Sequence, residues 1–395
     1  MCAFAGGLDA ARRVLEDRFG YPRFRIHQLK VLGPLLAGRN VLAVLPTGAG
    51  KSLCFQVPAL LTEGLTLVVS PLISLMQDQV GALRRRGIAA AYVNSQVDAE
   101  QRRMILDSTL AGRVTLLYCA PERLPSLTRR LLGTTTSVAL LAIDEAHCIT
   151  EWGNEFRPVY RRLGVFRAQL GHPLTIALTG SATPAARADI LAVLRIPDAE
   201  VVVTSFDRPN LTLAVRRVRD DQERFALLRA LVRAASQEGS AGASLVYTPT
   251  RRLTELVTRA LGRTSVRAAP YHAGLTAGTR RRVLRAFLAD QVSVIVATSA
   301  FGMGIDKPDV RQVIHWGPPP TLEAYYQEAG RAGRDGRPSD CRILWRPQDF
   351  GWGSIAAAMR RYVEARRCRR RMLLEYFGER AGGCTGCDMC EPARG

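Results

Sequence analysis

Short apolar runs alternate with polar segments of helical length along the first half of the chain. The runs are often β-branched and are bounded by Gly, Pro, Asp or Thr, which is typical of buried strands in a parallel sheet. They lie at residues 41–45, 65–70, 114–118, 138–143 and 175–178. The segments between them, such as 98–111, suit helices, so the pattern predicts an α/β domain whose parallel sheet is covered on both faces.

A second series of apolar runs follows with a different sequence. These runs lie at residues 244–247, 266–271, 292–297, 310–315 and 341–345, and they predict a second parallel sheet. The Asp-Arg-Pro-Asn stretch within 206–210 is the expected crossover. The segment 237–243, rich in Gly, Ser and Ala, is expected to be a loop because strand signals continue beyond it. Two such domains side by side form a cleft, where ligands commonly bind.

The first predicted strand leads into a glycine-containing loop, after which the chain becomes apolar and helical. The loop consists of Pro46, Thr47, Gly48, Ala49, Gly50, Lys51 and Ser52. Its glycines let the backbone amides point at a phosphate, at a helix N-terminus whose dipole favours the anion. Lys51 is expected to reach the β- and γ-phosphates of ATP, and Ser52 to ligate Mg²⁺. Leu45 stands where the general pattern has its first Gly, and a chance Gly-rich turn is the alternative.

An acidic pair follows the predicted strand 138–143. Asp144 and Glu145 begin an Asp-Glu-Ala-His sequence that ends at His147. A carboxylate at the end of an apolar strand is unfavourable unless it holds a cation, so Asp144 is expected to bind Mg²⁺ directly or through its ligands. Glu145 can orient and deprotonate the attacking water. Such pairs also cap helices, but a position after a strand and downstream of Lys51 favours the catalytic interpretation.

Two arginines in the second half can complete an ATPase site. Arg331 and Arg334 lie three residues apart within 327–334, a spacing that can place both on one face of a helix. Across the cleft they could stabilise charge on the γ-phosphate during its transfer, and closing and opening of the cleft would convert hydrolysis into motion. The alternative is a solvated basic helix.

The charge balance indicates a polyanionic partner. Basic residues outnumber acidic ones by 55 to 35, which gives a formal net charge of +20. Neutralising phosphates with release of counterions makes such an excess favourable, although an arginine-rich bias can also reflect genomic base composition. No apolar run reaches the roughly 18 residues that span a bilayer, and residues 1–20 become charged too early for a secretory signal. We therefore expect a cytoplasmic protein without disulfides.

Four cysteines near the C-terminus predict a structural zinc site. Cys384, Cys387 and Cys390 follow one another at two-residue spacings, and Cys368 lies upstream. Four thiolates suit tetrahedral Zn²⁺ and leave no open position for catalysis. A redox dithiol, which needs only two cysteines, is the alternative. Bound metal would hold together an arginine-rich segment that could hardly bury a core alone.

At these motifs the chain resembles superfamily 2 helicases, and specifically the RecQ family, from about Phe19 to Cys390. The resemblance implies two tandem RecA-like domains, at residues 1–205 and 206–350, and a small helical zinc-binding module at 351–395. It implies an ATP-dependent helicase that moves 3′ to 5′ on single-stranded DNA and unwinds duplexes in DNA repair or recombination, with ATP, Mg²⁺ and Zn²⁺ as cofactors. Polarity rests on the resemblance alone.

The resemblance also assigns site residues. Tyr21, Arg25 and Gln28, beside Phe24, match the adenine-recognition motif, with Ile26 and His27 replacing the commoner Pro-Gly. Asp306 matches a ribose-contacting carboxylate, and Gln327 belongs to a motif that lines the cleft. Motifs that contact DNA or link it to hydrolysis contain Ser70, Gln77, His147, Ser181 and Thr183.

The segment 152–158 resembles the aromatic-rich loop by which the RecQ family senses single-stranded DNA. Trp152 and Phe156 can stack on unpaired bases, and Arg157 can hold a phosphate. Asn154 and Glu155 replace the usual His-Asp. A hydrophobic anchor for the loop is the alternative interpretation.

A winged-helix domain, and often a further helical domain, follows the zinc module in the resembled family, whereas this sequence ends at Gly395. We therefore expect a protein that translocates or unwinds poorly, or that uses a partner such as a single-strand-binding or repair protein. We also expect a monomer. One alternative function is a DNA-binding ATPase or remodeler with weak unwinding. Another, an ATPase unconnected with nucleic acid, is disfavoured by the charge and by the Trp152 loop.

Overall fold

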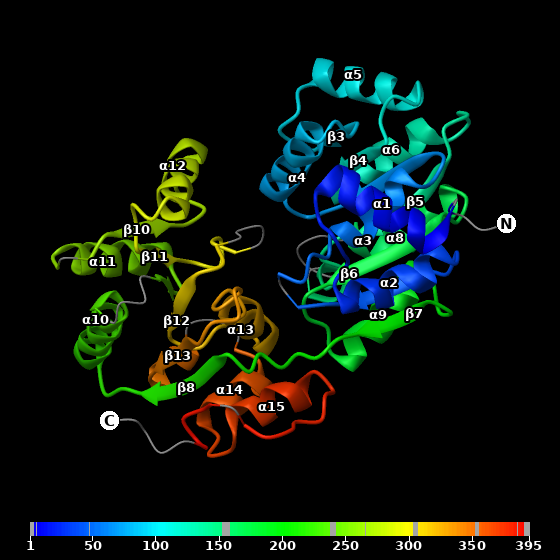
Figure 1. Ribbon diagram of the computed structural model, residues 1–395. Helices are drawn as coiled ribbons and strands as arrows, with labels where there is room; N and C mark the ends of the chain where they lie inside the picture. The colour runs from blue at the N-terminus through cyan, green and yellow to red at the C-terminus, as the bar shows by residue number, and fades with distance from the viewer. Residues whose placement is uncertain are drawn as a thin grey trace. The chain divides into compact units, whose positions relative to one another are not determined.

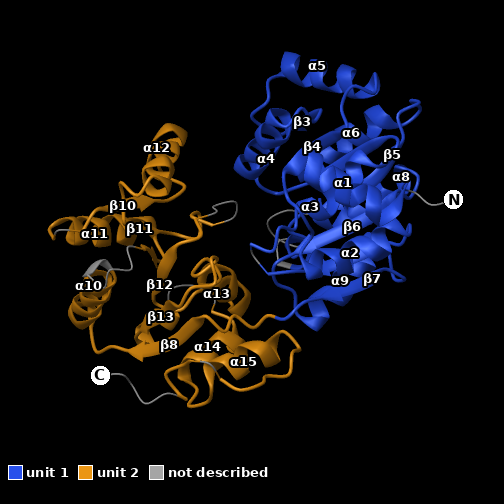
Figure 2. Cartoon of the chain, viewed as in Figure 1, with its two compact units in different colours: residues 1–205 blue, residues 206–395 orange. Residues whose placement is uncertain are grey.

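The computed structural model describes residues 4, 6–46, 48–151, 159–237, 242–264, 266–302, 307–351, 355–384 and 386–390. The chain forms two compact units, residues 1–205 and 206–395 (Figure 2). Each unit contains one parallel sheet with helices packed around it (Figure 1). Among the described residues, no helix combines the length and the apolar character needed to cross a bilayer.

The first unit has a seven-stranded sheet in the order β3-β4-β2-β5-β6-β1-β7, and all its strand pairs are parallel. The strands are β1 Val41–Val44, β2 Leu65–Val69, β3 Ala90–Val93, β4 Leu116–Cys119, β5 Val138–Ile143, β6 Leu174–Thr179 and β7 Glu200–Val203. The five predicted strands are confirmed within a few residues at each end. The two edge strands, β3 and β7, were not predicted.

The helices of this unit fill the intervals between the strands. They are α1 Gly7–Phe19, α2 Ile26–Leu36, α3 Leu53–Gln56, α4 Ile73–Arg85, α5 Ala99–Leu110, α6 Leu124–Leu131, α7 Cys148–Glu151, α8 Leu163–Gln169 and α9 Pro184–Leu194, with short 3-10 turns at Pro58–Leu60, Pro121–Arg123 and Tyr160–Arg162. The predicted helix at 98–111 is α5, which starts where Asp98 accepts a hydrogen bond from the Gln101 N–H at 2.8 Å.

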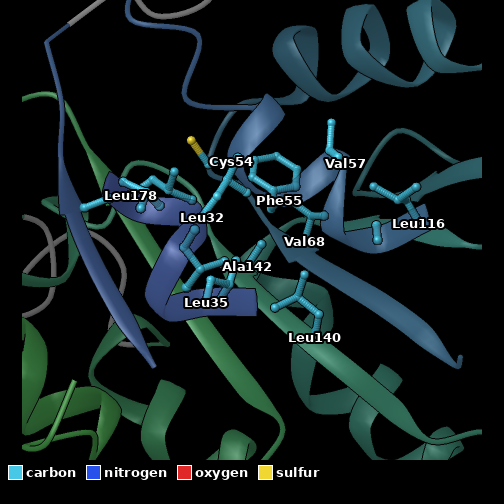
Figure 3. Close-up of a cluster of buried hydrophobic side chains, with 14 of the residues drawn as sticks. Leu32, Leu35, Cys54, Phe55, Val57, Val68, Leu116, Leu140, Ala142 and Leu178 are labelled. Atoms are coloured by element: carbon cyan, nitrogen blue, oxygen red, sulfur yellow. The ribbon is translucent and has the colours of Figure 1, made fainter. Parts of the chain in front are cut away.

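Alternating strand residues build the core of the first unit. Val68, Leu140 and Leu178 project from neighbouring strands toward Leu35 of α2 and Phe55 of α3 (Figure 3). Strand residues of the opposite parity are buried as well, which requires a second layer of helices on the other face. Burial on both faces explains why these strands are continuous apolar runs.

The second unit has a six-stranded parallel sheet in the order β10-β11-β9-β12-β13-β8. Its strands are β8 Leu211–Arg217, β9 Ala243–Tyr247, β10 Ala268–Tyr271, β11 Val294–Ala297, β12 Val310–Trp316 and β13 Ser339–Trp345. Its helices are α10 Asp221–Gln237, α11 Arg251–Gly262, α12 Ala277–Leu288, α13 Leu322–Ala329, α14 Ala357–Glu364 and α15 Arg369–Tyr376, with a 3-10 turn at Pro347–Gly351. The five predicted strands are confirmed, whereas the edge strand β8 was not predicted.

The cysteine-rich C-terminal segment packs on the edge strand β8. The Leu213 N–H donates to the Gly386 carbonyl at 3.3 Å, and the Asp388 N–H donates to the Leu213 carbonyl at 3.1 Å. The Asp388 carboxylate accepts a further hydrogen bond from the Val215 N–H at 2.9 Å. These bonds satisfy backbone groups that an edge strand would otherwise leave open, so the segment belongs to the same compact unit as the second sheet.

Candidate functional site

Four neighbouring strands of the first unit carry predicted nucleotide-binding and DNA-linked residues at or near their carboxyl ends. β2, β5, β6 and β1 lie side by side and parallel, so the loops that follow them meet at one edge of the sheet. The glycine-containing loop follows β1, and Ser70 follows β2. Asp144 follows β5, and Ser181 comes shortly after β6. The fold thus brings together motifs that are far apart in the sequence.

The glycine-containing loop has the backbone conformation that its sequence predicts. Gly48 and Gly50 have φ values of +82° and +75°, which side chains rarely tolerate. A Cβ atom at Gly50 would lie 2.6 Å from the Gln28 Nε2 atom, so a larger residue would both strain the backbone and displace the Gln28 amide. The Lys51 Nζ atom donates to the Leu45 carbonyl at 3.3 Å, and the helix α3 begins directly after Ser52. Thr47 lies outside the described residues.

The predicted adenine-recognition residues contact this loop from the N-terminus of α2. Buried Gln28 accepts a hydrogen bond from the Arg25 N–H at 2.8 Å and donates to the Gly50 carbonyl at 3.1 Å. The Arg25 guanidinium donates to the Gly48 carbonyl at 2.7 Å. Sequence reasoning assigned no contact to His27, yet its Nε2 atom lies 2.8 Å from the Ala49 carbonyl oxygen.

Tyr21, the third predicted adenine contact, is 49% exposed, which leaves its ring available to a ligand.

Asp144 is almost completely buried at the end of β5. Burial and the neighbouring charge of Glu145 raise the pKa of Asp144 to about 7, while Lys51, the Glu145 N–H and the Ser70 hydroxyl act in the opposite direction. A buried carboxylate beside a second carboxylate and a hydroxyl suits a hard divalent cation such as Mg²⁺. Glu145 has a φ of +50°, an unusual conformation for a residue other than glycine, and its N–H donates to the Asp144 carboxylate at 3.1 Å.

A chain of short contacts joins the acidic motif to the segment after β6. The His147 Nδ1 atom lies 3.3 Å from the Glu145 carboxylate and 3.0 Å from the Thr179 hydroxyl. The Thr179 hydroxyl donates to the Ser181 carbonyl at 3.0 Å and accepts from the Ser181 N–H at 3.2 Å. Sequence reasoning missed Thr179, whose only signal is its place at the end of a buried strand.

The other predicted DNA-linked residues of this unit lie on nearby elements. Thr183 caps α9 by accepting a hydrogen bond from the Ala186 N–H at 3.2 Å. Buried Ser70 directly follows β2, and Gln77 is exposed on α4. Trp152, Phe156 and Arg157 lie outside the described residues, and so does Asp306 of the second unit.

The prediction that one helix carries both arginines of the second unit is wrong. Helix α13 contains Gln327 but ends at Ala329, and Arg331 and Arg334 lie in the turn that follows. Gly333 in this turn has a φ of +56°, which no helix accommodates.

The crossover segment holds the arginine turn in place. The Arg208 guanidinium donates to the Gly330 carbonyl at 3.1 Å and to the Ala332 carbonyl at 2.8 Å. The Asn210 amide donates to the Gly333 carbonyl at 2.9 Å. Sequence reasoning interpreted Asp-Arg-Pro-Asn only as a crossover and missed this role, because the contacts join residues more than 120 positions apart.

The four C-terminal cysteines come together as predicted. The Sγ atoms of Cys368, Cys384, Cys387 and Cys390 all lie within 4.8 Å of one another, and those of Cys368 and Cys387 are 3.9 Å apart. Tetrahedral zinc with bonds of about 2.3 Å requires sulfur separations of about 3.8 Å, so the cluster fits this ion. Burial raises the pKa of Cys387, but hydrogen bonds from the backbone N–H groups of Arg369 and Met389 and from the Cys384 and Cys390 thiols together lower it to about 7.

Comparisons with known proteins agree with this arrangement. Residues 25–190 match the family model of the DEAD/DEAH box helicase, residues 223–336 match the helicase conserved C-terminal domain, and residues 355–391 match RecQ zinc-binding. The fold resembles Mycobacterium smegmatis helicase Lhr bound to ssDNA and AMP-PNP, with a TM-score of 0.66 and 21% identity over 87% of this chain and 48% of that chain. It also resembles S. cerevisiae Dbp5 bound to RNA and ADP BeF3, with a TM-score of 0.71 and 16% identity over 95% of each chain. The class defined by fold and sequence is therefore a helicase with two RecA-like domains and a zinc-binding module.

Closer relatives specify the family. The ATP-dependent DNA helicase RecQ of Haemophilus influenzae is 40% identical over 399 residues, which cover 96% of this chain and 63% of that protein. The ATP-dependent DNA helicase RecQ of Bacillus subtilis is 40% identical over 407 residues, which cover 98% of this chain and 68% of that protein. The chain belongs to the RecQ family of ATP-dependent DNA helicases. It spans less than two thirds of the length of the Haemophilus relative.

Proposed function

We propose that this chain couples ATP hydrolysis to 3′-to-5′ movement along single-stranded DNA and unwinds duplexes in DNA repair or recombination. The observation that carries the proposal is the meeting of Lys51, Asp144 and Glu145 at one edge of the first sheet. A path of close contacts leads from Glu145 through His147 and Thr179 to Ser181. A phosphate loop, a cation-binding carboxylate and a candidate base at one edge are the parts that phosphoryl transfer to water requires.

Each residue of this edge has a proposed role. Backbone amides of the loop from Thr47 to Gly50 and the ammonium of Lys51 hold the phosphates. Ser52 and Asp144 would hold Mg²⁺, which when bound offsets the charge of the phosphates. Glu145 orients the attacking water and accepts its proton, because its carboxylate is held beside His147 at 3.3 Å.

The remaining proposed roles follow the family pattern. Tyr21, Arg25 and Gln28 bind the adenine, and Asp306 binds the ribose. Gln327, Arg331 and Arg334, from the domain of residues 206–350, would stabilise the charge that develops on the triphosphate. Residues proposed to contact DNA or to couple it to hydrolysis are Ser70, Gln77, His147, Trp152, Phe156, Arg157, Ser181 and Thr183.

We further propose that the protein is a cytoplasmic monomer, with residues 1–205 as the first ATPase domain and residues 351–395 as a zinc-binding module. The formal net charge of +20 supports a nucleic-acid partner. We also propose that a single-strand-binding or repair protein assists this protein in unwinding.

ATPase activity measured with and without single-stranded DNA tests the proposal, together with strand displacement on duplexes that carry a 3′ or a 5′ tail. We expect strong stimulation by DNA and unwinding of the 3′-tailed substrate. Lys51→Ala should reduce turnover by at least about 100-fold, whereas the exposed Lys30→Ala serves as the matched lysine control. Turnover that ignores DNA, or that survives Lys51→Ala, would refute the proposal.

A further inference from the structure

A directed hydrogen-bond network lies beneath the phosphate loop and ends on Ser52. The Gln79 Nε2 atom, on α4, donates to the Ser52 hydroxyl at 3.2 Å. The Oε1 atom of the same amide accepts a hydrogen bond from the Tyr118 hydroxyl at 2.8 Å. Gln56 donates from its Nε2 atom to that hydroxyl at 3.0 Å. These residues come from α3, α4 and β4, so the network depends on the packed fold.

The network fixes which end of the Gln79 amide faces Ser52. Because Gln56 donates to the Tyr118 oxygen, the single phenolic proton is free to be donated to Gln79. The amide oxygen is thereby held toward Tyr118, and the amide nitrogen must point at Ser52. Tyr118 is fully buried, and its ring packs edge-on against the Phe55 ring, with the ring centroids 6.3 Å apart. The hydroxyl therefore cannot move easily.

An orienting donor at Ser52 has a chemical consequence. A serine hydroxyl has one proton and two lone pairs, and the Gln79 amide occupies one lone pair. The second lone pair is left for a cation, and the serine proton must point elsewhere. The charge of Asp144, the other proposed ligand, acts on the same Tyr118 hydroxyl and, after burial, raises its pKa.

We propose that Gln79 is a positioning residue for the Mg²⁺ site, with Tyr118 and Gln56 setting the direction of its amide so that the Ser52 hydroxyl presents a lone pair to the ion. This inference rests on the proposed function. Gln79 does not touch nucleotide or metal in this assignment. Its effect should therefore appear in the Mg²⁺ dependence of nucleotide binding and not in the affinity for nucleotide alone.

Equilibrium binding of a fluorescent ADP analogue to the full chain, with and without Mg²⁺, tests the inference. Gln79→Met keeps the length of the side chain and removes the donor. We expect it to reduce the Mg²⁺-dependent gain in affinity by roughly three- to tenfold, since one neutral hydrogen bond is lost, and to leave the Mg²⁺-free affinity unchanged. Tyr118→Phe keeps the packed ring and frees the amide to turn, so a smaller loss in the same direction is expected.

A kinetic readout separates positioning from a general structural role. The half-saturating Mg²⁺ concentration for ATP hydrolysis should rise in Gln79→Met, whereas turnover at saturating Mg²⁺ should stay near that of the wild type. Gln101→Met, an exposed glutamine on α5, is the matched control. If both variants of the network keep the full Mg²⁺-dependent gain, or lose Mg²⁺-free affinity equally, the inference is wrong. If the wild-type protein shows no Mg²⁺-dependent nucleotide binding, the proposed function itself fails.

Discussion

Replacing Asp144 by Asn should stabilise the nucleotide-free protein, and the gain should increase with pH. Burial and the charge of Glu145 raise the pKa of Asp144 from 3.8 to about 7. The native state therefore holds this proton more tightly than the unfolded chain does. The stabilising contribution of the protonated carboxyl is complete below pH 4, decreases as pH rises, and is lost above about pH 7. Asn cannot ionise, so the variant does not lose stability in this pH range.

The size of the effect follows from the shift in pKa. A difference of about three pKa units corresponds to about 4 kcal/mol over the whole range. Between pH 5.5 and pH 8.5, the difference in free energy of unfolding changes only from pH 5.5 to pH 7, by about 2 kcal/mol. For a unit of 205 residues this corresponds to about 4 to 8 °C in Tm.

Calorimetry of the full chain in Mg²⁺-free buffer at several pH values measures this difference. The advantage of Asp144→Asn in the unit of residues 1–205 should increase by about 2 kcal/mol between pH 5.5 and 8.5. When Glu145 is already replaced by Gln, the stability gained by Asp144→Asn should increase less with pH, because one cause of the raised Asp144 pKa is removed. Asp107→Asn, at an exposed carboxylate on α5, provides a matched control with a difference constant to about 0.5 kcal/mol. An advantage that is constant or decreases with pH would refute the reasoning.

Three further changes test the second unit. Asp349→Ala should cost about 3–5 kcal/mol in urea unfolding, because it removes the fully buried carboxylate that pairs with buried Arg224 at 2.6 Å, and replacing both residues by apolar ones should recover much of the loss. Arg370→Met should accelerate hydrogen exchange in residues 206–211 on the order of tenfold. The Arg370 guanidinium, which this change removes, donates to the Arg208 carbonyl at 2.9 Å and to the Leu211 carbonyl at 2.5 Å. Unchanged exchange would contradict a stabilising role of these contacts. Cys384→Ser should lower bound zinc below one ion per chain in elemental analysis and reduce the Tm of the second unit, and full zinc retention would contradict a four-cysteine site.

Sequence patterns predicted the central strands because those strands are buried on both faces. β5, for example, is apolar at every position from Val138 to Ile143. The edge strands gave a weaker signal for a physical reason. β7 exposes Val201 and Val203 to 40% and 39%, and β8 is polar toward its end at Arg217, so neither forms a bounded apolar run that differs from a loop with some valine or leucine.

Within the site, local motifs predicted Lys51, Asp144 and the four cysteines, because the spacing of these residues follows from the chemistry expected of them. The structure brings the four cysteines together. Thr179 and the contacts of Asn210 could not be found in this way, because their partners become neighbours only in the folded chain. The error at Arg331 and Arg334 has a different origin. A spacing of three was given more weight than the flanking glycines, and Gly333 in fact ends any helical continuation with its positive φ.

The contacts of the second unit connect its zinc cluster to its arginine turn. α15 begins at Arg369, directly after its N-cap residue Cys368, and its Arg370 donates to the Arg208 carbonyl of the crossover. Near the end of the same helix, the Phe377 ring stacks on Phe206 at 4.5 Å, and the Glu379 carboxylate accepts the Phe206 N–H at 2.6 Å. Arg208, fixed in this way, donates to three carbonyls of the turn that carries the two predicted catalytic arginines. Each link is a hydrogen bond or a ring contact between adjacent groups. Loosening the cysteine cluster should therefore accelerate hydrogen exchange most at the crossover and to a smaller extent at the arginine turn. A merely local zinc site would instead leave hydrogen exchange at residues 330–333 unaffected by Cys384→Ser.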